Sequence, residues 1–71
     1  MKQHANLAGS VYESDALRGP FLRWIGKRSN AAGLKVAGLD YTHGMRWLAG
    51  GVLRTDQQEK ARAVLSAAGV V

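Results

Sequence analysis

The amino-acid sequence predicts an all-α protein, a compact bundle of four to five short helices. Three observations lead to this prediction. No segment alternates apolar and polar residues over the length of a convincing β-strand. Apolar residues instead recur at spacings of three and four, in segments separated by glycines and helix-capping residues. With 71 residues, of which 46% are hydrophobic, the chain can build one small core and no second domain.

The first 14 residues mix polar with small apolar residues and show no periodic pattern. We predict a flexible N-terminal arm over residues 1–14 and a folded domain over residues 15–71. A frayed terminus explains this composition more simply than an arm that reaches a partner. Leu7, Val11 or Tyr12 could still attach part of the arm to the core.

The first helix is predicted to begin at Gly19-Pro20, because the fixed φ of proline and its missing N–H suit the first helical turn. One helical face is marked by residues three or four positions apart: Leu17, Phe21, Trp24, Ile25 and Arg28. We expect Phe21 and Trp24 to anchor the core. Three cations end the helix, where they complement its dipole: Arg23, Lys27 and Arg28.

A second, shorter helix is predicted over residues 31–37, with Ser29 or Asn30 as its N-cap. Leu34 and Ala37 would face the core, and Gly38 would end the helix. Leu39 can then enter the core across the turn, while Asp40 or Thr42 caps the next helix.

The third helix is predicted over residues 41–49, closed by Gly50-Gly51. Its buried face would hold Tyr41, Met45 and Leu48, with Trp47 beside them, which leaves Thr42, His43 and Arg46 outward, with Gly44 sterically neutral. A capping box, Thr55 with Gln58, opens the last helix. Its apolar stripe is Ala61, Val64, Leu65 and Ala68, and Gly69 is a suitable residue to follow its end.

The sequence argues against catalysis. The five acidic residues show no pairing on one helical face, and the serines lack a nucleophile-elbow context. His4 and His43 are far apart and the chain contains no cysteine, so no metal site is expected. No apolar run approaches the ~20 residues of a membrane span, and no secretory signal follows Lys2. We therefore expect a cytoplasmic protein that is not an enzyme and needs no cofactor, metal or small-molecule substrate.

The distribution of charge points to a partner. The net charge is +5, and the stretch from Arg18 to Arg54 holds seven Lys or Arg against Asp40 alone, a net charge of +6. Such a segment favours a polyanion or an acidic protein surface as partner. The alternative is a basic surface that serves solubility alone.

Residues 30–51 read Asn-Ala-Ala-Gly-Leu-Lys-Val-Ala-Gly-Leu-Asp-Tyr-Thr-His-Gly-Met-Arg-Trp-Leu-Ala-Gly-Gly. This segment resembles the helix-turn-helix of the Cro/repressor family, the small λ-repressor-like regulators of phages and bacteria. Gly38-Leu39 match the glycine and aliphatic residue of that family's turn, and residues 46–50 match an Arg-Trp-Leu-small-Gly phrase at the end of its recognition helix. The resemblance extends over residues 17–70 and is strongest over residues 38–50.

Two positions depart from the family pattern. Leu34 stands where the family keeps a small alanine, and Gly44 stands where it keeps isoleucine or valine. Either the turn is longer by a residue or two, or the third helix is rotated. The recognition helix is also poor in residues that read bases, since Arg46 is its only long hydrogen-bond donor.

The resemblance implies a helix-turn-helix transcription regulator that binds duplex DNA, as a homodimer on a two-fold site. Thr42, His43 and Arg46 would reach base edges, with Tyr41 at the start of the helix. Phosphates would be contacted by Arg23, Lys27, Arg28, Lys35 and Arg54. The alternative is a phage-type regulator that uses the same scaffold, its arm and Lys2 to bind host RNA polymerase and to inhibit initiation or alter termination. A third possibility is an interaction module of another kind.

Overall fold

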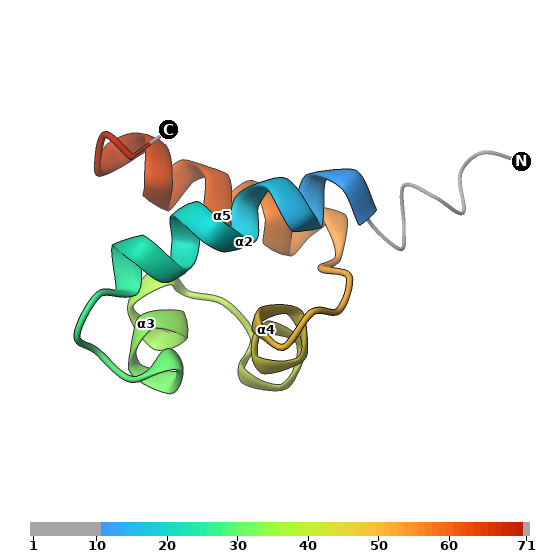
Figure 1. Cartoon of the computed structure of the whole chain (residues 1–71), viewed down its shortest axis with the longest axis horizontal. Coiled ribbons are helices and arrows are strands. Elements are labelled where there is room, and N and C mark those ends of the chain that lie inside the picture. Colours follow the sequence, from blue (N-terminus) through green and yellow to red (C-terminus); the bar gives the residue numbers. More distant parts are fainter. Residues whose placement is uncertain (1–10, 71) are drawn as a thin grey trace, which may run out of the picture.

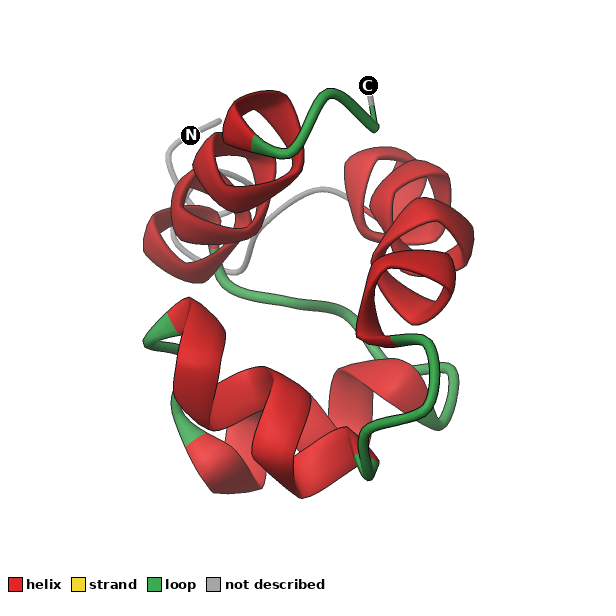
Figure 2. Ribbon diagram, turned by 90° about the vertical axis from the view of Figure 1, so that its left-hand side faces the viewer, coloured by secondary structure: helices red, strands yellow, loops and turns green. Residues whose placement is uncertain are grey.

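The computed structural model describes residues 11–70 and folds them into four helices: α2 (Val11–Ile25), α3 (Asn30–Ala37), α4 (Tyr41–Leu48) and α5 (Thr55–Ala67). The two longer helices, α2 and α5, pack against each other, and the shorter α3 and α4 lie together below them (Figure 1). Figure 2 shows the same two pairs from the side, with no strand in the described range. The predicted all-α bundle is therefore confirmed. None of these helices has the length and apolar character needed to cross a membrane.

The start of the first helix was predicted wrongly. Helix α2 already includes Val11, and Pro20 lies inside it. The buried face of α2 continues across the proline, because Ser14, Leu17 and Phe21 all point into the core. Pro20 cannot donate a helical hydrogen bond to Ala16, but Ala16 is exposed, so water can hydrate its carbonyl. Residues 11–14 are thus helical rather than part of an arm, while residues 1–10 of that predicted arm lie outside the described range.

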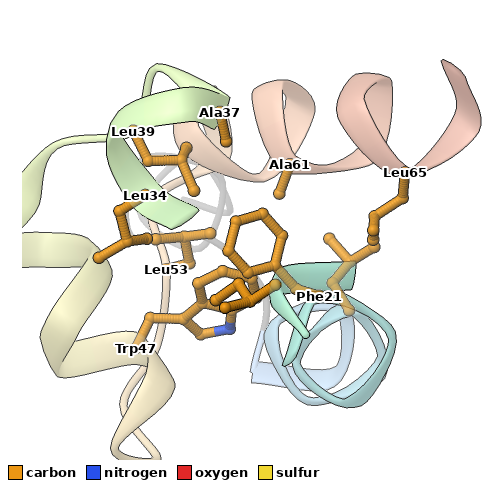
Figure 3. Close-up of a cluster of buried hydrophobic side chains, with 10 residues drawn as sticks. Phe21, Leu34, Ala37, Leu39, Trp47, Leu53, Ala61 and Leu65 are labelled. Atoms are coloured by element: carbon orange, nitrogen blue, oxygen red, sulfur yellow. The ribbon is translucent and has the colours of Figure 1, made fainter. Parts of the chain in front are cut away.

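The core is centred on two aromatic side chains, Phe21 and Trp47, both fully buried with ring centroids 5.1 Å apart (Figure 3). All four helices and both connecting segments near α4 contribute to it; its other buried apolar members are Leu17, Ile25, Leu34, Ala37, Leu39, Leu53, Ala61 and Leu65. Trp24 is only partly buried and packs against Phe21. Helix α2 ends at Ile25, so Arg28 follows its end instead of lying within its last turn, and it lies exposed over the Trp24 ring.

A buried polar network, which the sequence analysis missed, joins α2 to the segment before α5. The hydroxyl of Ser14 accepts hydrogen bonds from the Leu53 backbone N–H at 2.8 Å and from the Gln58 side chain at 3.1 Å. Gln58 also donates to the Leu53 carbonyl, and the Trp47 indole N–H donates to the Ser14 carbonyl. These bonds compensate the cost of burying Ser14 and Gln58 and fix the path of the chain between α4 and α5.

The N-cap of helix α5 lies one residue before Thr55, the residue predicted to cap it. Thr55 is its first residue and Arg54 its N-cap, and Gln58 is buried in the network around Ser14. Ala61 and Leu65 line the core as predicted and Val64 is partly buried, but Ala68 is exposed beyond the end of the helix. Gly69 follows with a φ of 73°, the conformation expected of a glycine after a helix.

Candidate nucleic-acid interface

Helices α3 and α4 are joined by a turn of three residues, 38–40. Ser29 caps α3 by accepting a hydrogen bond from the Ala32 N–H at 3.1 Å. Gly38 ends α3 with a φ of 77°, a left-handed conformation that favours glycine. Leu39 is buried, and Asp40 caps α4 by accepting from the His43 N–H at 2.9 Å. Each of these predicted features is confirmed.

A hydrogen bond also joins this turn to α5. The side-chain carbonyl of Gln57, which is buried at the start of α5, accepts a hydrogen bond from the Asp40 N–H at 2.8 Å. The bond satisfies a donor at the start of α4 that the helix itself cannot satisfy. The position of α4 therefore depends on α5 as well as on α3.

The buried face of α4 differs from the prediction. Trp47 and Gly44 are its buried residues, Met45 and Leu48 are partly buried, and Tyr41 is 61% exposed. Gly44, which the sequence left as sterically neutral, is buried against α3. The side of α4 that faces the core is centred on Trp47, because the large indole ring fills the centre of the core. Tyr41, the first residue of the helix, projects beyond the core.

Leu34 and Gly44, the two positions that differ from the Cro/repressor pattern, lie in contact with each other. A Cβ atom placed on Gly44 would lie 2.5 Å from Leu34 Cδ2 and 2.9 Å from Cδ1. The isobutyl group of Leu34 thus occupies the space that a side chain at position 44 would fill. The large residue is on α3 and the small one on α4, and the turn between the helices spans only three residues.

All nine predicted site residues are exposed, but they do not form one group. Thr42, His43 and Arg46 lie on the side of α4 opposite its buried face, with Tyr41 at its start. Lys35 is on the neighbouring α3, and three further cations lie at the end of α2 or in the turn to α3: Arg23, Lys27 and Arg28. Arg54 stands apart, in the segment that leads to α5, where its Nε lies 3.4 Å from Asp56. Lys2, assigned to the polymerase alternative, lies outside the described residues.

Ion pairs distribute the charge unevenly over the described range. Acidic side chains pair with one cation each on α5, on α2 and on the segment before α5: Glu13 with Arg62, Asp15 with Arg18, and Asp56 with Arg54. In the same range, Arg23, Lys27, Lys35 and Arg46 have no acidic partner, whereas on α5 only Lys60 lacks one. The side of the molecule formed by α3, α4 and the end of α2 therefore carries uncompensated positive charge.

Asp40 is the one acidic residue between α3 and α4, and its role is local. The backbone N–H of His43 donates to this carboxylate and lowers the pKa of Asp40, with a smaller contribution in the same direction from the His43 side chain. The His43 Nδ1 atom lies 2.8 Å from Asp40 Oδ2. Both contacts hold the carboxylate at the start of α4.

Arg18 is a residue whose role the sequence analysis did not identify. Its Nε donates to the Trp47 carbonyl and one terminal nitrogen donates to the Gly51 carbonyl, each at 2.7 Å. These carbonyls lie at and beyond the end of α4, where helical hydrogen bonds run out. Arg18 thus ties the end of α4 to α2. Its place beside the buried face of α2 is a weak sequence signal, because nothing in the sequence specifies partners about thirty residues away.

Within residues 11–70, no group of three or more His, Cys, Asp or Glu side chains is arranged to hold a metal ion. Comparisons with protein-family models, with curated proteins and with solved structures found no match for this chain.

Proposed function

We propose that this protein is a small helix-turn-helix transcription regulator that binds duplex DNA by placing α4 in the major groove. The observation that carries the proposal is the division of α4 into two sides. Trp47 and Gly44 hold one side against the core, while Thr42, His43 and Arg46 stay exposed on the other. An α-helix with its side chains is about 10–12 Å across, and the major groove is about 12 Å wide.

The uncompensated cations support this orientation. With α4 in the groove, α3 and the end of α2 lie towards the sugar-phosphate backbone, as the first helix of such a pair does. Lys35 on α3 and the cations at residues 23, 27 and 28 would then neutralise phosphates. Arg54 precedes α5 and pairs with Asp56 in the first turn of that helix, so it is the weakest member of the predicted phosphate-binding set.

The side chains of α4 define what the helix can read. Arg46 can donate to the O6 and N7 atoms of guanine, and the Thr42 hydroxyl can donate or accept. Arg46 is exposed and has no acidic partner in the described range, so it is available to a base or a phosphate. We propose that the protein acts without catalysis, and that two copies bind a two-fold site.

The proposal is tested by measuring DNA affinity as a function of salt. Fluorescence anisotropy with a random duplex should show binding that weakens steeply between about 50 and about 200 mM salt, with a log–log slope near −4 if about four or five phosphates are contacted. The absence of measurable affinity for any duplex at about 50 mM salt would refute the proposal.

Substitution of Arg46 tests whether α4 reads bases or only contacts phosphates. On a duplex enriched by selection, Arg46→Ala should weaken binding by about 1–3 kcal/mol if Arg46 reads a base, and should affect random DNA much less. If Arg46 contacts only phosphate, both affinities should fall alike and the magnitude of the salt slope should drop by about one. Lys60→Ala removes one exposed charge from α5 and is the matched control, because α5 lies away from α4's outward side. Equal effects of the two substitutions would contradict a reading role for α4.

The polymerase-binding alternative predicts a different result. A pull-down from bacterial lysate should then retain polymerase subunits after nuclease treatment, and Arg46→Ala should leave DNA affinity unchanged. Loss of all partners on nuclease treatment agrees with DNA binding.

A further inference from the structure

The contact between Asp40 and His43 determines which ring nitrogen of His43 carries a proton. Asp40 Oδ2 accepts from the His43 backbone N–H at 2.9 Å and lies 2.8 Å from His43 Nδ1. An ionised carboxylate can only accept hydrogen bonds. The Nδ1 atom must therefore be the protonated one, both in the neutral imidazole and in the imidazolium.

The other ring nitrogen is left for a partner. His43 is exposed, its side chain 45% accessible, and Nε2 forms no hydrogen bond within residues 11–70. In the neutral ring, Nε2 holds a lone pair and accepts a hydrogen bond. In the protonated ring, the same atom becomes a donor.

We propose that His43 is a specificity-determining residue that reads a base through Nε2, in a tautomer fixed by Asp40. The inference rests on the proposed function, because it needs the outward side of α4 to face the major groove. It adds the chemistry of the contact: neutral His43 selects an amino group, the N6 of adenine or the N4 of cytosine. Protonated His43 instead selects the O6 or N7 of guanine, or a phosphate oxygen.

The surroundings of His43 leave Asp40 as the group that holds the ring. On α4 the other charged residue is Arg46, and α3, packed against α4, carries only Lys35. Helix α2 also packs against α4; its charged residues Glu13, Asp15 and Arg18 are engaged in ion pairs, and its remaining one is Arg23. No second carboxylate in this set is free to compete for Nδ1.

The first test uses the free protein and needs no DNA. The ¹⁵N shifts of the His43 ring above neutral pH report which nitrogen is protonated, and Nδ1 is expected to be the protonated one. Asp40→Ser keeps an N-cap oxygen for α4 but removes the carboxylate, so its His43 ring should shift towards the Nε2-protonated form. A wild-type ring that is protonated mainly at Nε2 overturns the inference.

The second test selects binding sites from random duplexes at pH 8 and at pH 5.5. One position of the site should favour adenine or cytosine at pH 8, and its preference should move by about fivefold to tenfold towards guanine at pH 5.5. His43→Ala should abolish this change, whereas His4→Ala, at the chain's other histidine, should leave it intact.

The outcomes separate the inference from the proposed function. DNA binding with a base preference that does not depend on pH, or with the wrong tautomer, overturns the inference alone. An absence of DNA binding at both pH values overturns both.

Discussion

Replacement of Trp47 by alanine is expected to lower the free energy of unfolding by about 3–5 kcal/mol, the usual cost of removing a fully buried tryptophan. The ring is 0% exposed and packs on Phe21, and its N–H donates to the Ser14 carbonyl at 2.8 Å. A domain of this size has a total stability of only about 4–10 kcal/mol. The loss is therefore a large share of the total, so the variant should unfold at a much lower temperature and urea concentration than the wild type.

Thermal and urea unfolding followed by circular dichroism measures this effect. Trp24→Ala is the matched control, because Trp24 also contacts Phe21, with ring centroids 5.2 Å apart, but is only partly buried. The control should lose clearly less stability. An unchanged melting temperature for Trp47→Ala would show that Trp47 is exposed and would make it a candidate binding residue.

The second large effect concerns the contact between α3 and α4. Gly44→Val should destabilise the protein by about 1–3 kcal/mol, because Leu34 Cδ2 already lies 2.5 Å from the position of the new Cβ and Leu34 is 1% exposed. Leu34→Ala alone should cost about 2–5 kcal/mol by leaving a cavity. In the double variant the valine fills that cavity, so the combined loss should be smaller than the sum of the two.

A double-mutant cycle of urea unfolding measures the coupling. We expect an interaction energy of about 1–3 kcal/mol between positions 34 and 44. Leu34→Ala combined with Thr42→Val is the control, because Thr42 is exposed on the same helix, and its effects should add. Additive losses for positions 34 and 44 would show that these residues do not share one space in the core.

Local signals predicted much of the fold. Ser29, Gly38 and Asp40 act within one helical turn of their own positions, so the bounds of α3 and the start of α4 could be read from the sequence. The start of α2 could not, because it depends on a buried serine whose partners, Leu53 and Gln58, lie on distant parts of the chain. Pro20 was interpreted as the start of a helix, but it lies inside α2, and buried side chains on both sides of it pack this helix against the core.

The candidate site was predicted to a similar extent. The outward positions of Thr42, His43 and Arg46 followed from helical periodicity and agree with the structure. The inward turn of Gly44 did not follow, because a glycine has no side chain to show which side of a helix is buried. Its contact with Leu34 depends on how two helices pack, which neither helix's own pattern contains.

An amide NMR titration of the protein with random duplex DNA tests most directly whether the outward side of α4 binds DNA, as we propose. The largest shift changes should fall on Thr42, His43 and Arg46, with smaller ones at Lys35 and at residues 27 and 28. The exposed residues Glu59, Lys60 and Ser66 of α5 should change little. Changes confined to α5, or no changes in excess DNA at about 50 mM salt, would contradict DNA binding by α4.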